Sequence, residues 1–490
     1  MFPRSLHLTK NEFIGWGFTL FLAFALGVAI LLTTNILTGK WLVALIAALL
    51  TPWILIVSRD AESVLLFLFI FLLPVNLNHY FTPSKEYATG ASGISISACD
   101  VLLACLYGIW IFRLFSSPRG RRHLRWFPSL SIPYALLWLC GAWSGLSAAK
   151  PMFSLYELIK LAKGWLGFFY LANNILTERK IVTIIVALTL AVLGQSLLGF
   201  AQHFLNAHLG LEVLGESRTS LLLQKTGAFK LSRVGGTLGH PNALALFFII
   251  TLPAILNFLF VKGRAWLKVL ALPVLIAGTL TLILTFSRSG MIAFLIAAGS
   301  TVFLGAWKNR GFLFALTASA VFWFFLLMLT LPFLSALSAR FFEHDYGRAL
   351  SRIPLMRVAM NMIQAHPLTG VGLNNYIVVM QGYDDTKEAI SVYFTAQVHN
   401  MYLLAAAETG LPGLFFLLWL LAVAFKTGWD GFWKNEGLMS FFCLGFVGAF
   451  LGVLIQKLVE AGYPSSYFFS LMLGVFAASK LWHERQEPDR

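Results

Sequence analysis

The sequence predicts an all-α, polytopic integral membrane protein. The chain has 490 residues, of which 58% are hydrophobic and only 12% are charged, whereas soluble domains average about 25% charged residues. Its mean hydropathy is +0.78. At roughly 20 apolar residues per span, this composition accommodates about 12–14 transmembrane helices. These values exclude a soluble enzyme, a disordered protein and a nucleic-acid binder, despite the formal net charge of +15.

Apolar runs of about 17–25 residues give fourteen candidate spans along the chain. They are 13–36, 41–57, 61–77, 98–115, 131–149, 155–176, 180–205, 240–260, 266–286, 289–306, 312–334, 400–425, 438–458 and 465–482. The first run is too long for the apolar part of a signal peptide and has no small-residue cleavage site, so we expect it to be a retained helix.

The distribution of positive charge predicts the orientation. Alternate loops and the two termini together hold 20 Lys and Arg residues, while the short loops opposite hold five, namely Lys40, Lys85, Lys150, Arg288 and Lys457. Cytoplasmic loops carry the excess of Lys and Arg. We therefore expect an inner-membrane (cytoplasmic-membrane) protein with both termini in the cytoplasm, and we interpret the net charge as a signal of topology.

Two long polar segments, 206–239 and 335–399, then lie on the extracytoplasmic side. Loops of this length are usually functional or disordered, but residues 340–365 have apolar side chains at helical spacing. We expect an extracytoplasmic helical cap there, ended by Pro367. We divide the chain into N-terminal spans (1–205), a core with both outer segments (206–425), and C-terminal spans with a cytoplasmic tail (426–490).

Arg288 and Arg233 are candidate anion-binding residues at the outer membrane boundary. Arg288 lies in the tight Ser-Arg-Ser-Gly turn at 287–290, and its alternative role is that of a snorkelling arginine. Arg233 opens a segment with three glycines that ends in His-Pro-Asn at 240–242, directly before a span. A helix that starts after such a segment favours phosphate, although an ordinary loop remains possible, with His240 as a neutral helix-end residue.

His399 ends the second outer segment, directly before the span 400–425. Its pKa near 6.5 suits a general base, and its alternative role is a polar helix cap. Glu408 lies nine residues further on, roughly 13.5 Å along the helix and on nearly the opposite face, so it cannot pair with His399 directly. Its alternative role is a buried carboxylate bonded to another helix.

Two further groups have weaker support. Lys160 and Lys163 lie near the outer end of their span and could reach an anion or act as interfacial lysines. The pair Asp384 and Asp385 resembles a metal site but lies in a polar loop, where solvation is the simpler interpretation. The sequence has no Walker A, His-Glu-x-x-His or Cys-x-x-Cys motif. We therefore expect no cofactor and no metal.

Taken together and in order, these motifs resemble the O-antigen ligase / O-antigen polymerase superfamily over about 230–415. The shared pattern is an arginine, a Gly-rich stretch and Pro-Asn before a span; an arginine–glycine turn; an outer helix ending in Pro-x-x-Gly-x-Gly; and His-Asn-x-x-Leu followed by Glu-x-Gly-x-x-Gly. The matching residues are Arg233, Asn242, Arg288, Gly290, Pro367, Gly370, Gly372, His399, Asn400, Leu403, Glu408, Gly410 and Gly413.

The resemblance implies a GT-C-like membrane glycosyltransferase that uses a polyprenyl-diphosphate-linked glycan, such as an undecaprenyl-diphosphate donor, and a glycan or glycolipid acceptor. It implies an inverting transfer on the extracytoplasmic (periplasmic) face. The residues themselves suit this chemistry, because arginine forks bind phosphate and a histidine can take a hydroxyl proton. We expect His399 as the base, Arg233 and Arg288 with Lys160 and Lys163 at the diphosphate, and Asn242, Arg357, Asn400 and Glu408 in support.

Three functions follow, in order of preference. The first is an O-antigen ligase-like transfer to a finished lipid or wall anchor. The second is an O-antigen or exopolysaccharide polymerase of the same superfamily, which the long outer segments favour. The third, from another class, is an anion transporter, which would also place arginines in the membrane but for which the inverted repeats of many transporters are not evident.

Overall fold

The computed structural model describes residues 60–81, 93–116, 124–217, 222–226, 229–263, 265–335, 337–338 and 352–486. The chain forms two compact units, Met1–Val64 and Leu65–Arg490. The first two expected spans, 13–36 and 41–57, lie outside the described residues. Everything that follows concerns the larger unit, apart from the start of α3.

Helices dominate the described part of the chain, as the sequence predicts. The longer ones are α3 (Ala61–Phe71), α4 (Ala98–Ser116), α6 (Pro128–Leu146), α7 (Pro151–Asn174), α8 (Glu178–Leu205), α9 (Pro241–Leu256), α10 (Ala265–Leu284), α11 (Arg288–Arg310), α12 (Phe312–Thr330), α14 (Arg352–Ala365), α17 (Met401–Lys434), α18 (Gly437–Gln456) and α19 (Tyr467–Gln486). Eight helices of the described ranges are long and apolar enough to cross a membrane. An all-α polytopic membrane protein is thus confirmed.

The structure differs from the expected spans in two respects. Helix α3 ends at Phe71 rather than near residue 77, because the chain turns there toward a short hairpin. That hairpin pairs β1 (Asn78–Phe81) antiparallel with β2 (Ile94–Ser97), and a second one pairs β3 (Leu222–Thr226) with β4 (Phe229–Arg233). Strands of four or five residues in polar segments are too short for a hydrophobic alternation to reveal them.

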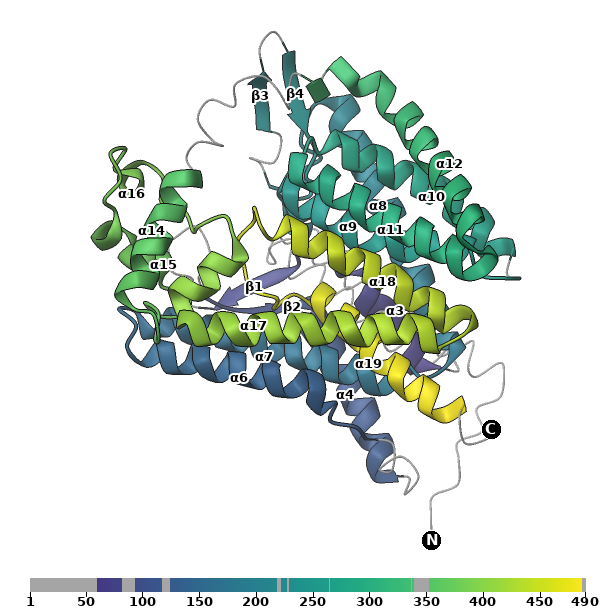
Figure 1. Cartoon of the computed structure of the whole chain (residues 1–490), viewed down its shortest axis with the longest axis horizontal. Helices are drawn as coiled ribbons and strands as arrows, with labels where there is room; N and C mark the ends of the chain where they lie inside the picture. Colours follow the sequence, from purple (N-terminus) through teal and green to yellow (C-terminus); the bar gives the residue numbers. More distant parts are fainter. Residues whose placement is uncertain are drawn as a thin grey trace, which may run out of the picture. The chain divides into compact units, whose positions relative to one another are not determined.

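Helix α18 is the centre of the packing within the larger unit. It contacts α9 and α11 on one side and α17 and α19 on the other (Figure 1). Helix α7 packs on α19, and α6 packs on α17. Most of the residues of α18 are buried, in keeping with its central place. The arrangement brings the starts of α9, α11 and α17 and the end of α18 into one neighbourhood, where the candidate site lies.

The predicted extracytoplasmic cap is a small helical cluster before α17. It consists of α14, which ends two residues before Pro367, followed by α15 (Tyr376–Val379), the 3-10 turn η5 (Met380–Tyr383) and α16 (Ile390–Tyr393). Figure 1 shows these helices grouped around the start of α17. Leu355, Val358, Ala359 and Met362 form the buried face of α14, which packs against α17.

A backbone joint fastens the cap to α17. The amides of Val371 and Gly372 donate to the carbonyls of Ala407 and Glu408, and the amide of Leu411 donates to the carbonyl of Pro367. The helical backbone of α17 is interrupted at Gly410, which has φ 72° and ψ 179°. A Cβ at Gly370, where φ is +66°, would collide with the backbone of Glu408. Only glycine suits both positions, because they combine left-handed φ with close backbone approach.

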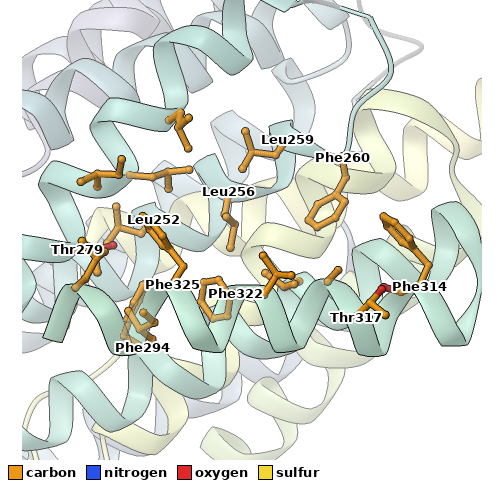
Figure 2. A pocket seen from close by; sticks show the side chains of 18 residues that line it. Leu252, Leu256, Leu259, Phe260, Thr279, Phe294, Phe314, Thr317, Phe322 and Phe325 are labelled. Carbon is orange, nitrogen blue, oxygen red and sulfur yellow. The ribbon is translucent and has the colours of Figure 1, made fainter. Parts of the chain in front are cut away.

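An apolar cavity of about 500 Å³ lies between α9, α10, α11 and α12. Figure 2 shows side chains from all four helices around it, among them Leu252, Thr279, Phe294 and Phe322. Helix α12 forms one wall and is itself little buried, so many of its side chains face away from the protein. Two of these helices, α9 and α11, also begin at the candidate site.

Candidate functional site

The two arginine-bearing segments meet through Asn242. The Nε of Arg233 donates to the carbonyl of Thr285 at 2.8 Å, and its Nη2 donates to Oδ1 of Asn242 at 3.1 Å. The same Oδ1 accepts from the hydroxyl of Ser287 at 3.0 Å. Arg233 is only 6% exposed. The structure therefore joins the segment before α9 to the turn before α11, two segments that are separate in the sequence.

Arg288 is the first residue of α11 and is partly exposed. Ser287 caps this helix, since its hydroxyl accepts from the amide of Gly290 at 3.3 Å. A serine in this position is a favoured helix cap. The N-terminal end of α11 and the guanidinium on it both contribute positive potential. An anion that binds beside Asn242 would thus be close to the guanidinium of Arg233 and to the N-terminal end of α11.

His240 caps α9 with its side chain. Its Nδ1 accepts from the amide of Asn242 at 3.1 Å. Burial lowers the pKa of His240 to about 4, with help from the positive charges of Arg233 and His399. The side chain nevertheless retains exposed surface. The imidazole of His240 is therefore neutral near pH 7 and accessible to a ligand.

His399 lies near His240, since a proton on its ring would further lower the pKa of His240. It is partly buried, and its ring centroid is 6.4 Å from that of Phe394. Burial lowers the pKa of His399 below its usual 6.5, and the positive charge of Arg352 adds to this. No hydrogen bond to its imidazole is formed by any residue in the described ranges. The ring is thus neutral at pH 7 and able to accept a proton.

The end of α18 connects the arginine segments with the histidine segment, a feature that sequence reasoning missed. The Nε2 of Gln456 donates to the carbonyl of Asn242 at 3.3 Å and to Oε2 of Glu460 at 2.9 Å. The amide of Met401 donates to the carbonyl of Lys457 at 2.9 Å. The only sequence signal was polar residues after an apolar run, which is also typical of an ordinary loop.

Asn400 caps the helix that begins next to His399, whereas Glu408 binds the loop of the cap. Oδ1 of Asn400 accepts from the amides of Tyr402 at 2.9 Å and Leu403 at 3.0 Å, so Asn400 caps α17. Glu408 is fully buried, and its position on α17 agrees with the expectation that it cannot pair with His399. Its carboxylate accepts from the amides of Asn374 (2.9 Å) and Tyr376 (3.2 Å) and from the hydroxyl of Tyr463 (3.0 Å).

Arg357 lies on α14 and forms a two-pronged ion pair within the cap. Its Nε and Nη2 donate to the two carboxylate oxygens of Asp385 at 2.9 and 2.8 Å. Asp384 accepts from the amides of Thr386 at 3.0 Å and Ser391 at 2.8 Å. The two aspartates thus fold the loop of the cap rather than standing free in solvent. A role of Arg357 in glycan contact stays a prediction.

The two lysines of α7 have different surroundings. Lys160 lies 3.4 Å from buried Glu157, and its charge also acts on Lys457 at the end of α18. Lys163 pairs with Asp100 at 2.8 Å and donates to the carbonyl of Ser95. These contacts hold Lys160 beside Glu157 and tie Lys163 to the hairpin and the start of α4. Diphosphate binding by either lysine stays a prediction.

The assembled groups suit a reaction of an anionic lipid with a neutral nucleophile. One side offers a buried arginine and the start of α11, and the other offers a neutral histidine that can accept a proton. Within the described ranges, no three side chains of His, Cys, Asp or Glu come close enough to hold a metal ion.

Residues 272–418 match the family model described as O-antigen ligase. The matched segment contains Arg288, Arg357, His399, Asn400 and Glu408, whereas Arg233 and Asn242 precede it. This confirms, for that segment, the resemblance that the motifs predict. No curated protein matches the chain.

Proposed function

We propose that this protein is a membrane glycosyltransferase of the O-antigen ligase type. It transfers a glycan from a polyprenyl-diphosphate donor to an acceptor hydroxyl on the extracytoplasmic face of the cytoplasmic membrane. The observation that carries the proposal is that Asn242 joins Arg233, the turn before α11 and His240 by hydrogen bonds, with His399 near His240. The family match over residues 272–418 supports the same reaction class.

The donor arrives already activated, because a lipid diphosphate is a good leaving group. The site has to hold the negative charge that grows on this group as the glycosidic C–O bond breaks. Guanidinium charge and a helix start favour phosphate oxygens, and Arg233 and the start of α11 with Arg288 supply them here. Preorganised charge of this kind is usually the largest single contribution to catalysis.

The acceptor hydroxyl is a weak nucleophile at neutral pH. As its oxygen bonds to the anomeric carbon, its proton passes to the neutral imidazole of His399. The lipid diphosphate departs with the bonding electron pair from the opposite face, which inverts the anomeric centre. The lowered pKa of His399 keeps the base unprotonated at pH 7. Charge stabilisation by arginines makes the proposed reaction metal-independent, and activity should persist in excess chelator.

The apolar cavity supports a lipid-linked donor. Phe294 lies six residues after Arg288 on α11, roughly 9 Å along the axis. Leu252 lies ten residues after Asn242 on α9, roughly 15 Å along it. The cavity therefore lies deeper along the same helices that carry the anion-binding residues. A hydrocarbon chain that hangs from a diphosphate at Arg233 and Arg288 would run toward it.

A transfer assay with purified protein tests the proposal. The protein, in lipid nanodiscs, is given a polyprenyl-diphosphate glycan with and without a glycolipid acceptor. We expect the glycan on the acceptor, and unchanged donor when the acceptor is omitted. A ladder of longer products from the donor alone would establish a polymerase instead. Absence of any transfer, together with movement of the anion across liposomes, would favour the transporter.

Labelling in intact cells tests the proposed topology. The substitutions Ser217→Cys and Asp385→Cys, each in a background without the four native cysteines, place a thiol in each outer segment. Both should react with a membrane-impermeant thiol reagent before lysis, and a Cys at Lys480 should react only afterwards. The reverse pattern would place the site in the cytoplasm and refute the proposed location.

A further inference from the structure

His240 uses one ring nitrogen to cap α9, and its other ring nitrogen is available for a second role. The amide N–H of Asn242 can only donate, so Nδ1 of His240, 3.1 Å away, must be the unprotonated ring nitrogen. In a neutral imidazole the proton then resides on Nε2. The backbone thereby fixes the tautomer and leaves one N–H donor on the far edge of the ring.

The surroundings of this donor favour an anionic ligand. His240 lies beside Arg233 and at the N-terminal end of α9, where the helix dipole repels a cation on the ring. Burial and the nearby charge of Arg233 hold its pKa at about 4, so the ring stays neutral beside a positive guanidinium. The side chain has exposed surface, so a ligand can reach it.

We propose that Nε2–H of His240 donates a hydrogen bond to an oxygen of the donor diphosphate, which makes His240 a substrate-binding residue of the transfer site. The inference rests on the proposed function, and it gives His240 and His399 different roles. His399 accepts a proton from the acceptor, whereas His240 keeps its proton and contributes a fixed dipole. No proton is transferred to or from His240.

Two substitutions separate this role from helix capping. In His240→Asn, the amide oxygen can take the place of Nδ1, because asparagine is a strong helix cap, but the side chain is too short to reach the position of Nε2. In His240→Gln, the terminal amide can reach the position of Nε2, but capping is weak. If His240 only caps α9, the His240→Asn variant should bind the diphosphate as the wild type does. If His240 binds the diphosphate, the His240→Gln variant should retain that binding.

The measurement is binding of farnesyl diphosphate and farnesyl monophosphate to the purified full-length protein in nanodiscs. We expect His240→Asn to weaken diphosphate binding about 10- to 100-fold, the usual effect of losing a hydrogen bond to a charged group. Monophosphate binding should weaken less, and His240→Gln should retain most of the diphosphate affinity. Wild-type affinity in His240→Asn, or an equal loss in both variants, would overturn the assignment.

The pH dependence adds a second readout. The charged and titratable groups around His240 are Arg233 before α9 and the neutral His399 before α17, with Glu460 joined through Gln456 after α18. Because a neutral donor does not titrate above its pKa of about 4, the ratio of wild-type to His240→Asn affinity should be constant from pH 6 to 8. A ratio that grows as the pH falls would show a charged imidazolium and overturn the neutral donor.

The same data separate this inference from the proposed function. If the wild type does not bind farnesyl diphosphate, or if Arg233→Ala leaves its affinity unchanged, the proposed donor site itself is wrong. If Arg233→Ala weakens binding and His240→Asn does not, only the role of His240 is wrong.

Discussion

The residues of the family-like motifs lie in two parts of the molecule, the joint between the cap and α17 and the candidate site. These two parts differ in how their polar groups are paired. In the cap joint, Gly370, Gly372, Gly410 and Glu408 are buried in backbone contacts, and the Glu408 carboxylate has three hydrogen-bond donors. At the candidate site, His240 and His399 remain accessible to some degree, and no residue in the described ranges bonds to the His399 ring. The polar groups of the cap joint bond to one another and stabilise the fold, whereas the two histidines of the candidate site can still bond to a ligand.

Among the substitutions that test this comparison, we expect the replacement of His399 to give the largest loss of transfer activity. Loss of a general base typically costs about 10²- to 10⁴-fold in rate, so His399→Ala should nearly abolish transfer at unchanged expression and thermal stability. The matched control is His366→Ala, which removes a histidine of the cap that contacts the Tyr383 hydroxyl at 2.7 Å. If His399→Ala kept more than about a tenth of the activity, the base would have to be another group.

The pH profile sharpens the same point. Only the neutral form of His399 can accept a proton, so kcat/KM should fall as the pH decreases through the pKa of this ring. Because burial and Arg352 lower that pKa, the acid limb should lie below pH 6.5. An acid limb well above 6.5 would be inconsistent with His399 as the base in this environment.

Arg233→Ala should weaken donor binding without removing the base. We expect farnesyl diphosphate affinity to fall about 10- to 100-fold, and Arg233→Lys to be impaired as well because a lysine lacks the fork that spans Thr285 and Asn242. The control is Lys426→Ala, whose side chain is 74% exposed on α17 and pairs with Asp430. Equal losses for diphosphate and monophosphate would show that Arg233 does not distinguish them.

Gly370→Ala tests the cap joint. A side chain there would combine a φ of +66° with a collision against the backbone of Glu408. Strain of this kind costs about 1–3 kcal/mol, so the Tm of the purified protein should fall while kcat per folded molecule changes little. Gly382→Ala, in the same cap but with open space around it, is the control. An unchanged Tm would mean that the joint contributes little to folding.

Arg357→Ala should give the smallest effect. Its partner Asp385 is in the cap, and the two side chains are 61% and 50% exposed, so solvent screens the pair. We expect transfer to change by about twofold or less, with the same result for Asp385→Ala and for the double variant. A large loss in Arg357→Ala that Asp385→Ala does not share would instead assign Arg357 to the glycan.

The sequence predicted the helices well because a membrane span needs a long apolar run, and that requirement is local. The cap helix was also predictable, since α14 has a buried apolar face at helical spacing and ends just before Pro367. The hairpins β1–β2 and β3–β4 were not, because short strands in polar segments have no comparable pattern.

The sequence indicated candidate site residues but not the contacts among them. Arg233, Arg288 and His399 stood out because charge at the membrane boundary is unusual. The bridging role of Asn242, the link through Gln456 and the nearness of His399 to His240 depend on how α9, α11, α17 and α18 pack. Nothing local in the sequence reveals contacts between segments that far apart.

The open side of α12 has a consequence for kinetics. This helix walls the apolar cavity and presents many side chains away from the protein, so under the proposed function a lipid carrier reaches the site, and its spent form leaves, by lateral diffusion in the plane of the bilayer. Saturation should then follow the mole fraction of the carrier among the lipids rather than its molar concentration in the assay. Diluting the vesicles with buffer should leave the rate per protein unchanged, whereas diluting the carrier with other lipids should lower it.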